Sequence, residues 1–241
     1  MFDNASVRSN NPAANKPIFN VRENFTPRFE QNEVSMCGAV ESWSANGETS
    51  FGKEILSVVL RVPRLSGTVD RVLVCIPNET ADLFKITLRP GDPLMVSGQV
   101  RTHFDSEGHQ HTEVFAYMAA NTAIVKNNTN CVRLTGEIAK QPVYRVTPFG
   151  REITDTILRV PYSDPTYRGV AYVPVVFWGN LAKLMATYHV KETISIFGRF
   201  QSREYDKLNE SGEMEKKTAF EVSVHHFTPI ERNLINNRGI F

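Results

Sequence analysis

The sequence predicts an all-β protein made of two consecutive copies of one small barrel. Three observations indicate this fold class: an internal repeat, short runs of alternating apolar and polar residues, and a single short helical pattern in each copy. The repeat relates residues 34–120 to residues 131–227, where the same landmarks recur in the same order. Two copies of about 90–100 residues are too few and too long for a solenoid and indicate a duplicated domain.

The landmarks of the repeat are glycines and short motifs at a nearly constant spacing. The corresponding pairs are Gly38 and Gly136, Phe51-Gly52 and Phe149-Gly150, Leu-Arg-Val-Pro at 60–63 and at 158–161, and Ser-Gly-Gln-Val at 97–100 and Phe-Gly-Arg-Phe at 197–200. We expect a first domain over 34–125 and a second over 131–230, with a disordered, Asn-rich arm over 1–33 and a short tail over 231–241.

Composition is ordinary for a soluble globular chain, with 41% hydrophobic and 22% charged residues among 241. The sequence has no run of 18 apolar residues and no pattern of a secretory signal, so we expect a cytoplasmic protein. The cysteines are scattered, which favours a reducing compartment over a disulfide framework; they are Cys37, Cys75 and Cys131.

The net charge of +1 does not by itself indicate a polyanionic partner. The two copies nevertheless differ: residues 34–120 hold 7 basic and 10 acidic residues, whereas residues 131–227 hold 13 and 11. The second copy is therefore the better candidate for contact with a polyanion.

The second copy gives the clearest order of elements. Strands are expected at 132–138, 153–160, 172–179, 194–205 and 220–224. A short helix is expected between the third and fourth strands, with Asn180 as its N-cap. Residues 142–150, 162–169 and 207–217 are expected as polar connections. Five strands with one helix in this place are the plan of an OB-fold.

The first copy follows the same plan. Its strands are expected at 36–43, 55–62, 69–76, 94–102 and 112–119, with a turn at Asn46-Gly47 and a short helix at 79–84. The prediction is therefore two tandem OB-folds.

Strand alternation separates the side chains of the second copy into two faces. Val173, Val175 and Phe177 are expected inside the barrel, and Tyr172 and Trp178 outside it. In the fourth strand the same rule places Phe197, Arg199, Arg203 and Tyr205 outside. Exposed rings provide stacking platforms for bases of any sequence, and arginines follow the phosphates, so this face is typical of a single-stranded nucleic-acid site.

The same residues also fit roles without nucleic acid. The outer rings would equally pack against the other copy or a second subunit, and Arg199 and Arg203 would equally be solvated. The first copy lacks the ring pattern and keeps mainly Phe104 and Arg101 as candidates. It is expected to contact nucleic acid more weakly or to serve assembly.

Four stretches of the second copy together resemble the bacterial single-stranded DNA-binding protein family. They are Leu-Thr-Gly-Glu-Ile at 134–138, Tyr-Arg-Val-Thr-Pro-Phe-Gly at 144–150, Tyr-Val-Pro-Val-Val-Phe-Trp-Gly-Asn-Leu-Ala at 172–182 and Phe-Gly-Arg-Phe-Gln-Ser-Arg-Glu-Tyr at 197–205. The first copy matches only through the duplication. Because the chain ends in Asn-Asn-Arg-Gly-Ile-Phe without an acidic run, the tail-less primosomal replication proteins are the nearest variant.

The resemblance implies that rings at Tyr172, Trp178 and Tyr205 stack on bases and that Arg199 and Arg203 contact phosphates. It also implies assemblies of four OB-folds, and therefore a homodimer of this chain in the bacterial cytosol or nucleoid. The candidate single-stranded DNA site combines these positions with neighbouring rings and arginines: Tyr172, Trp178, Tyr205, Arg199, Arg203, Phe197, Tyr167, Arg159, Arg101 and Phe104.

The expected function is sequence-tolerant binding of single-stranded DNA in replication, recombination or repair, with RNA as a possible ligand and replication or repair proteins as possible partners. The alternative is a protein–protein adaptor of the primosome or plasmid-replication type. A zinc site at His109 and His111 would need a third ligand, and solvated loop histidines are favoured. No serine-hydrolase or phosphate-loop motif occurs, so we expect no enzyme, cofactor or metal.

Overall fold

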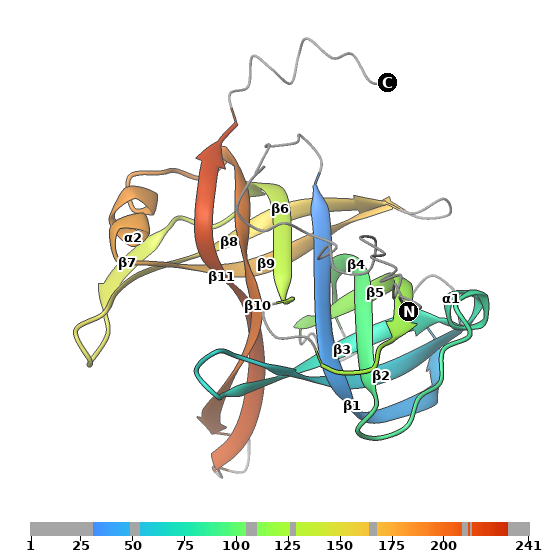
Figure 1. Ribbon diagram of the computed structural model, residues 1–241. Coiled ribbons are helices and arrows are strands. Elements are labelled where there is room, and N and C mark those ends of the chain that lie inside the picture. Colours follow the sequence, from blue (N-terminus) through green and yellow to red (C-terminus); the bar gives the residue numbers. More distant parts are fainter. Residues whose placement is uncertain are drawn as a thin grey trace, which may run out of the picture.

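The computed structural model describes residues 31–48, 54–104, 110–125, 129–163, 168–208, 212 and 214–230. It consists of strands with two short helices, as Figure 1 shows. The elements in chain order are β1 (Asn32–Glu48), β2 (Glu54–Pro63), β3 (Val69–Pro77), α1 (Asn78–Leu83), β4 (Pro93–Phe104), β5 (Gln110–Asn121), β6 (Cys131–Ile138), β7 (Val143–Val146), β8 (Glu152–Ser163), β9 (Arg168–Trp178), α2 (Asn180–Met185), β10 (Thr193–Leu208) and β11 (Met214–Pro229).

Each copy closes into its own barrel. In the first, β1 pairs with β2 and with β4, β2 pairs with β3, β4 pairs with β5, and a short parallel pairing of β3 with β5 completes the circle. In the second, β6 pairs with β8 and β10, β8 with β9, β10 with β11, and β9 pairs with β11 in parallel. The helix of each copy follows its third barrel strand. The predicted all-β class and tandem OB-folds are confirmed.

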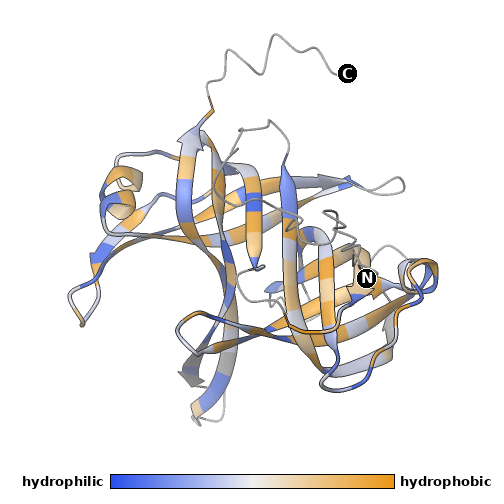
Figure 2. Ribbon diagram, viewed as in Figure 1, coloured by the Kyte–Doolittle hydropathy of each residue, from blue (hydrophilic) through white to orange (hydrophobic). Residues whose placement is uncertain are grey.

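The barrel interiors hold the side chains that alternation placed there. Val173, Val175 and Phe177 are buried, as are Ile194 and Ile196. Figure 2 shows the alternation of hydrophobic and hydrophilic residues along the strands.

The glycine landmarks of the repeat lie where two backbones approach closely. A Cβ on Gly98 would lie 2.2 Å from the carbonyl oxygen of Phe115, and one on Gly198 would lie 2.3 Å from that of Ser223. Both glycines sit at a register shift between the fourth and fifth strands of their barrel. The repeat therefore preserves a backbone contact that a side chain would prevent.

Several element boundaries differ from the prediction. The expected connection at 142–150 contains β7, which pairs with β8. Strands β10 and β11 extend into the expected hydrophilic loop and pair out to Leu208 and Met214. Asp206, Met214, Glu215 and Lys216 are exposed, so this part of the hairpin has the composition of a loop.

Two local predictions were wrong. Asn46-Gly47 lies in β1, at a register shift between Ser44 and Gly47, rather than in a turn, because the strand continues to Glu48. Asn180 is the first residue of α2 and not its cap; Gly179, at φ 55°, precedes the helix and no side chain caps it. A positive φ suits glycine and sets the sharp change of direction from strand to helix.

The arm was expected to end at residue 33, but β1 already begins at Asn32. Residues 1–30 and the tail at 231–241 lie outside the described residues.

The two barrels are joined through their first strands. β1 and β6 pair antiparallel, from Asn32 opposite Leu134 to Ser35 opposite Cys131, so that one sheet of 11 strands runs through both barrels. Figure 1 shows β1 and β6 side by side at the centre of the molecule.

Equivalent contacts on the two sides of this seam give the chain an approximate internal two-fold symmetry. Asn32 exchanges two hydrogen bonds of 2.8 Å with the backbone of Val100, and Asn130 does the same with Phe200 at 2.6 and 3.0 Å.

The β4–β5 and β10–β11 hairpins each cross onto the opposite barrel. The hydroxyl of Thr102 accepts a hydrogen bond from the backbone N–H of Tyr172 at 2.9 Å, and the hydroxyl of Ser202 accepts one from that of Arg71 at 3.2 Å. Tyr172 in the second barrel therefore corresponds to Arg71 in the first.

No helix in the described part of the chain is long and apolar enough to cross a membrane.

Candidate nucleic-acid interface

The outer face of strands β8 and β9 carries the rings that the sequence singled out. Register places Arg159 opposite Tyr172 and Ile153 opposite Trp178. Directly paired residues project from the same face of a sheet, and residues two apart on one strand do so too. Tyr172 and Trp178 therefore share one face and lie about 20 Å apart along β9.

Trp178 is half-buried and fixed at one edge. Its indole Nε1–H donates a hydrogen bond of 3.1 Å to the hydroxyl of Ser223 on β11. On the same face, Ile153 and Val176 are buried. The indole is therefore held in one orientation, with part of its surface in solvent.

Tyr172 is 39% exposed, although its backbone belongs to the contact between the barrels. Its N–H is bound by Thr102, and its carbonyl oxygen accepts a hydrogen bond of 2.7 Å from Gln110 Nε2. The first barrel thus holds the backbone of this position while the ring reaches solvent.

Arg159 is exposed beside Tyr172, and within the described ranges no carboxylate pairs with it. Arg168 is also exposed and lies four residues before Tyr172 on the same face. Arg168 was missed by the sequence prediction, because its strand was expected to begin only at residue 172. Continuing the alternation from Tyr172 toward the start of β9, two residues at a time, would have found it.

Arg199 was expected to contact phosphate, but in the structure it lies between the barrels. Its side chain is 12% exposed, its Nη2 lies 3.7 Å from Asp70 Oδ2, and it donates a hydrogen bond of 2.7 Å to the carbonyl of Pro63. Burial lowers the pKa of Arg199, and the nearby carboxylate of Asp70 opposes this shift.

Arg203 remains exposed, with its Nε 3.9 Å from Glu221 Oε2. It lies on the part of β10 that follows Ser202, where the hairpin crosses onto the first barrel. Neither Arg199 nor Arg203 pairs in register with Tyr172 or Arg159.

Arg101 is buried rather than displayed. Its guanidinium carbon lies 3.6 Å from the ring centroid of Phe115 and 4.8 Å from that of Tyr162, which comes from the other barrel. A cation between two rings contributes to the contact between the barrels, so Arg101 is not available to phosphate.

Phe197 is half-buried. It contacts His225 edge-on at 6.2 Å between centroids, and the guanidinium of Arg133 lies 5.9 Å from its ring. Tyr167 lies outside the described residues, as do the side chains of Tyr205 and Phe104, whose backbones belong to β10 and β4.

The corresponding face of the first barrel is built differently. Arg71 takes the place of Tyr172 and binds Glu41, with its Nε 3.0 Å from a carboxylate oxygen. Ile55, Cys75 and Phe115 form a separate apolar cluster there. The thiol of Cys75 donates a hydrogen bond of 3.0 Å to Glu113, and burial raises the pKa of this thiol, with the Glu113 carboxylate adding to the effect.

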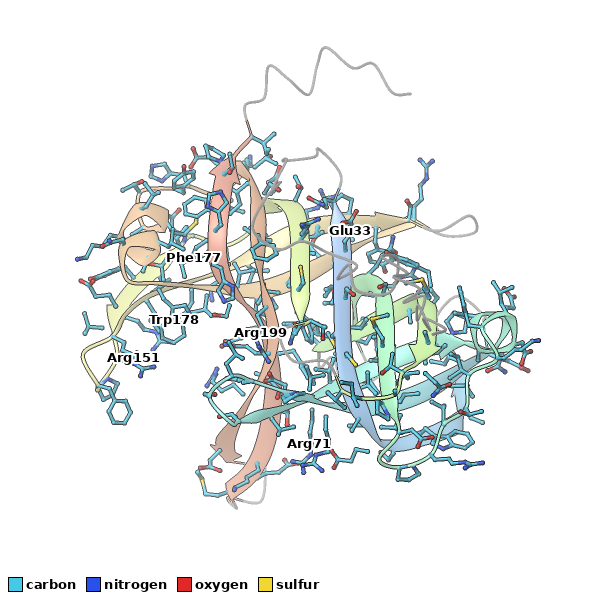
Figure 3. All side chains as sticks on the ribbon, viewed as in Figure 1. Glu33, Arg71, Arg151, Phe177, Trp178 and Arg199 are labelled. Carbon is cyan, nitrogen blue, oxygen red and sulfur yellow. The ribbon has the colours of Figure 1, made fainter. Side chains whose placement is uncertain are left out.

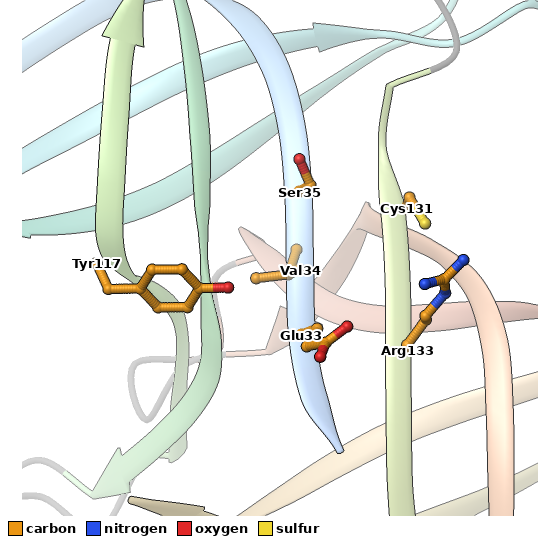
Figure 4. Close-up of a pocket in the computed structure, with 6 residues that line it drawn as sticks. All are labelled: Glu33, Val34, Ser35, Tyr117, Cys131 and Arg133. Carbon is orange, nitrogen blue, oxygen red and sulfur yellow. The ribbon is translucent and has the colours of Figure 1, made fainter. Parts of the chain in front are cut away.

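A small pocket lies at the seam between β1 and β6, as Figure 4 shows. Its lining mixes one acidic and one basic side chain with small residues and a ring: Glu33, Val34, Ser35, Tyr117, Cys131 and Arg133. It is separate from the ring-bearing face.

No group of three metal-ligating side chains occurs within the described ranges. His103 stacks on His111 at 5.3 Å between ring centroids, and His103 Nδ1 lies 3.8 Å from Glu113. His109, the other half of the histidine pair considered for zinc, lies outside the described residues.

A closed five-stranded barrel with a helix after its third strand is an OB-fold, and this one carries rings and an exposed arginine on its outer face. Residues 129–230 match the model of the single-strand binding protein family. The match spans the second barrel, which is therefore an OB-fold similar to those of this family. Proteins of this family bind single strands and are not enzymes.

Two solved structures are similar to the chain over most of its length. The first is the crystal structure of the wild-type single-stranded DNA binding protein from Thermus aquaticus, at 18% identity and a TM-score of 0.65, covering 84% of this chain and 94% of that one. A deletion mutant of the Thermus aquaticus protein matches at 18% identity and a TM-score of 0.63, covering 84% and 95%. No curated protein sequence matches the chain.

Proposed function

We propose that the chain binds single-stranded DNA with little sequence preference on the outer face of β8 and β9. The observation that carries this proposal is the pairing of exposed Tyr172 with exposed Arg159, on the same face as the half-buried ring of Trp178. Rings accept any base by stacking, and an arginine without a carboxylate partner is available to a phosphate.

The setting of this face supports the proposal. The second barrel is the copy with the excess of basic residues and the family match. Arg168 and Arg159 add positive charge at the Tyr172 end of the strands. The proposed strand of DNA therefore runs along β9, with its bases on Tyr172 and Trp178.

The proposal extends to the biological setting that such binding serves. Protection of single strands is needed in replication, recombination and repair, and we place the protein in the bacterial cytoplasm or nucleoid. A homodimer would bring four OB-folds together.

Titration of the full chain with oligothymidine tests the site. Binding is expected to quench the fluorescence of Trp178 and to weaken as salt rises, because phosphate contacts release counterions. Replacing Tyr172 and Trp178 with Ala is expected to cost about 1–3 kcal/mol of binding free energy per ring. Anisotropy of a labelled oligonucleotide measures this loss independently of tryptophan.

A Trp43→Phe variant is the matched control for the fluorescence signal. Trp43 is 46% exposed and lies on β1 of the first barrel, away from the proposed face. Its loss should leave both the quench and the affinity unchanged. Undiminished binding after removal of both rings would refute the site, and no binding to any single strand, DNA or RNA, would favour the protein–protein adaptor.

A further inference from the structure

Tyr172, the exposed ring of the proposed site, lies on a part of β9 where the neighbouring groups on one side come from the first barrel. The pairing of β9 with β11 covers Val175 and Val176. At Tyr172, three residues earlier, β9 pairs with β8 on one side, and side chains of the first barrel take the place of a strand on the other. The position of this residue therefore depends on both barrels.

Two side chains of the β4–β5 hairpin bind both backbone polar groups of Tyr172. The hydroxyl of Thr102 accepts a hydrogen bond of 2.9 Å from its N–H, and Gln110 Nε2 donates one of 2.7 Å to its carbonyl oxygen. Thr102 pairs with Thr112 across the hairpin, and Gln110 lies two residues before Thr112, so Thr102 and Gln110 project from the same face. We call these two side chains the Tyr172 clamp.

The Tyr172 clamp fixes the point from which the ring projects. In an antiparallel ladder, successive residues alternately turn their N–H and C=O toward the partner strand and away from it. Tyr172 turns both groups toward the first barrel, and its ring lies on the face that it shares with Arg159. A side chain whose backbone is held at both polar groups loses less freedom when it meets a ligand.

The corresponding position in the other half of the molecule is held differently. There the N–H of Arg71 donates a hydrogen bond of 3.2 Å to the hydroxyl of Ser202, on the β10–β11 hairpin. Figure 3 shows Arg71 beside this hairpin. The register of the two hairpins makes Thr218 the counterpart of Gln110. The long amide side chain therefore occurs on the half that presents the ring.

We propose that Thr102 and Gln110 are positioning residues for the binding of single-stranded DNA. The first barrel, through these two side chains, holds Tyr172 in the orientation in which its ring stacks on a base. This inference rests on the proposed function, because it concerns the same site and gives the first barrel a task there. The first barrel then contributes to affinity through the backbone of Tyr172.

The test removes the Tyr172 clamp one side chain at a time, with Thr102→Val and Gln110→Ala in the full chain. Each variant is titrated with a labelled oligothymidine of about eight nucleotides, within the range of single OB-fold sites. We expect about three- to tenfold weaker binding, as for the loss of one hydrogen bond, and a smaller loss than from Tyr172→Ala. Thr102→Ser keeps the hydroxyl and should bind like the parent chain.

Ser202→Ala is the matched control, because it removes the equivalent hydrogen bond to Arg71 in the other half of the molecule. It should lower the urea midpoint of unfolding at least as much as Thr102→Val, since the Ser202 hydroxyl also lies 3.3 Å from Asp70 Oδ1. Its affinity for the oligothymidine should nevertheless equal that of the parent chain. Equal losses of affinity from Ser202→Ala and Thr102→Val would mean that the Tyr172 clamp serves only the docking of the barrels, and would overturn the proposal.

A double variant separates positioning of the ring from a general loosening of the chain. In a Tyr172→Ala chain there is no ring to position, although the backbone groups that the Tyr172 clamp binds are still present. Thr102→Val should therefore weaken binding no further in that chain. A loss of the same size with and without the ring would contradict the positioning role.

Hydrogen exchange reports on the contact itself, in the absence of DNA. The amide of Tyr172 should exchange faster in Thr102→Val than in the parent chain, because the hydrogen bond that protects it is gone. Faster exchange with unchanged affinity, in a chain whose binding still depends on Tyr172, would overturn the positioning proposal alone. Failure of the parent chain to bind any oligothymidine would overturn both proposals.

Discussion

Asp70 is completely buried where the two barrels meet, and groups from both barrels share its carboxylate. Arg64 Nε donates to it at 2.9 Å, the backbone N–H of Ser202 donates at 2.8 Å, and Arg199 approaches to 3.7 Å. The hydrogen bond to Asp70 raises the pKa of Arg64. A buried carboxylate is tolerated here because each of its oxygens has a donor.

Replacing Asp70 with Ala is therefore expected to lower the free energy of unfolding by about 3–5 kcal/mol, because Arg199 loses its carboxylate in a buried place. The adjacent Arg71 is the matched control: its pairing with Glu41 is exposed, and Arg71→Ala should cost less than about 1 kcal/mol. Urea unfolding measures both. Equal, small effects would mean that the barrels dock without this network.

Single residues were the scale at which the sequence was least informative. Strand alternation correctly placed Tyr172 and Trp178 outside the barrel, but it placed Arg199 there as well. Part of the outer surface of each barrel is buried where it contacts the other barrel. Arg199 and Arg101 are buried there by residues more than 60 positions away in the sequence. Alternation within one strand carries no information about such contacts.

Most elements could be predicted because burial imposes a period on their sequence. The barrel strands keep one face in the core, so apolar residues recur at every second position. β7 keeps no face in the core, and Asp206, Met214, Glu215 and Lys216 in the outer part of the β10–β11 hairpin are exposed, so these sequences predicted loops. Hydrogen bonds between the strands, not an apolar pattern, hold these extensions together.

The equivalent glycines of the repeat give a prediction for whole elements. Gly198→Ala should destabilise the chain by about 2–3 kcal/mol, because the new Cβ would lie 2.3 Å from the Ser223 carbonyl and force β10 and β11 apart. Gly98→Ala should have a similar effect on the first barrel. Thr218→Ala, at a surface position on β11, serves as control and should stay within about 0.5 kcal/mol.

Thermal unfolding followed by circular dichroism measures these changes. If Gly198→Ala were as stable as Thr218→Ala, the close approach of the two strands would not be what the repeat preserves.

At the scale of the whole molecule, the two barrels share a fold but not a surface. The internal two-fold symmetry relates Tyr172 to Arg71, and the register relates Trp178 to Pro77. Neither ring of the second barrel therefore has an aromatic counterpart in the first. Arg71 is moreover paired with Glu41, which leaves it less available to a phosphate.

The two copies thus share an architecture, whereas Tyr172 and Trp178 have no equivalent rings in the first copy. The sequence predicted this asymmetry, since the ring pattern was visible only in the second half. The sequence of a single strand shows which rings point out of its barrel, although which outward residues stay exposed depends on how the barrels dock.

One short oligothymidine is therefore expected to bind per chain, not two. With about eight nucleotides, within the range of single OB-fold sites, isothermal titration should give a stoichiometry near one per chain. In a homodimer, which light scattering would identify, it should give two per particle. Two equivalent oligonucleotides per chain would show that the first barrel binds as the second does.

The arginines beside the two positions test the same asymmetry by substitution. Arg159→Ala should weaken binding several-fold, because Arg159 is exposed beside Tyr172 and would contact phosphate. Its counterpart Arg61, which pairs with Arg71 on the first barrel, is the matched control, and Arg61→Ala should bind like the parent chain in the same titration. Equal losses from both substitutions would show that rings are not what distinguishes the two faces.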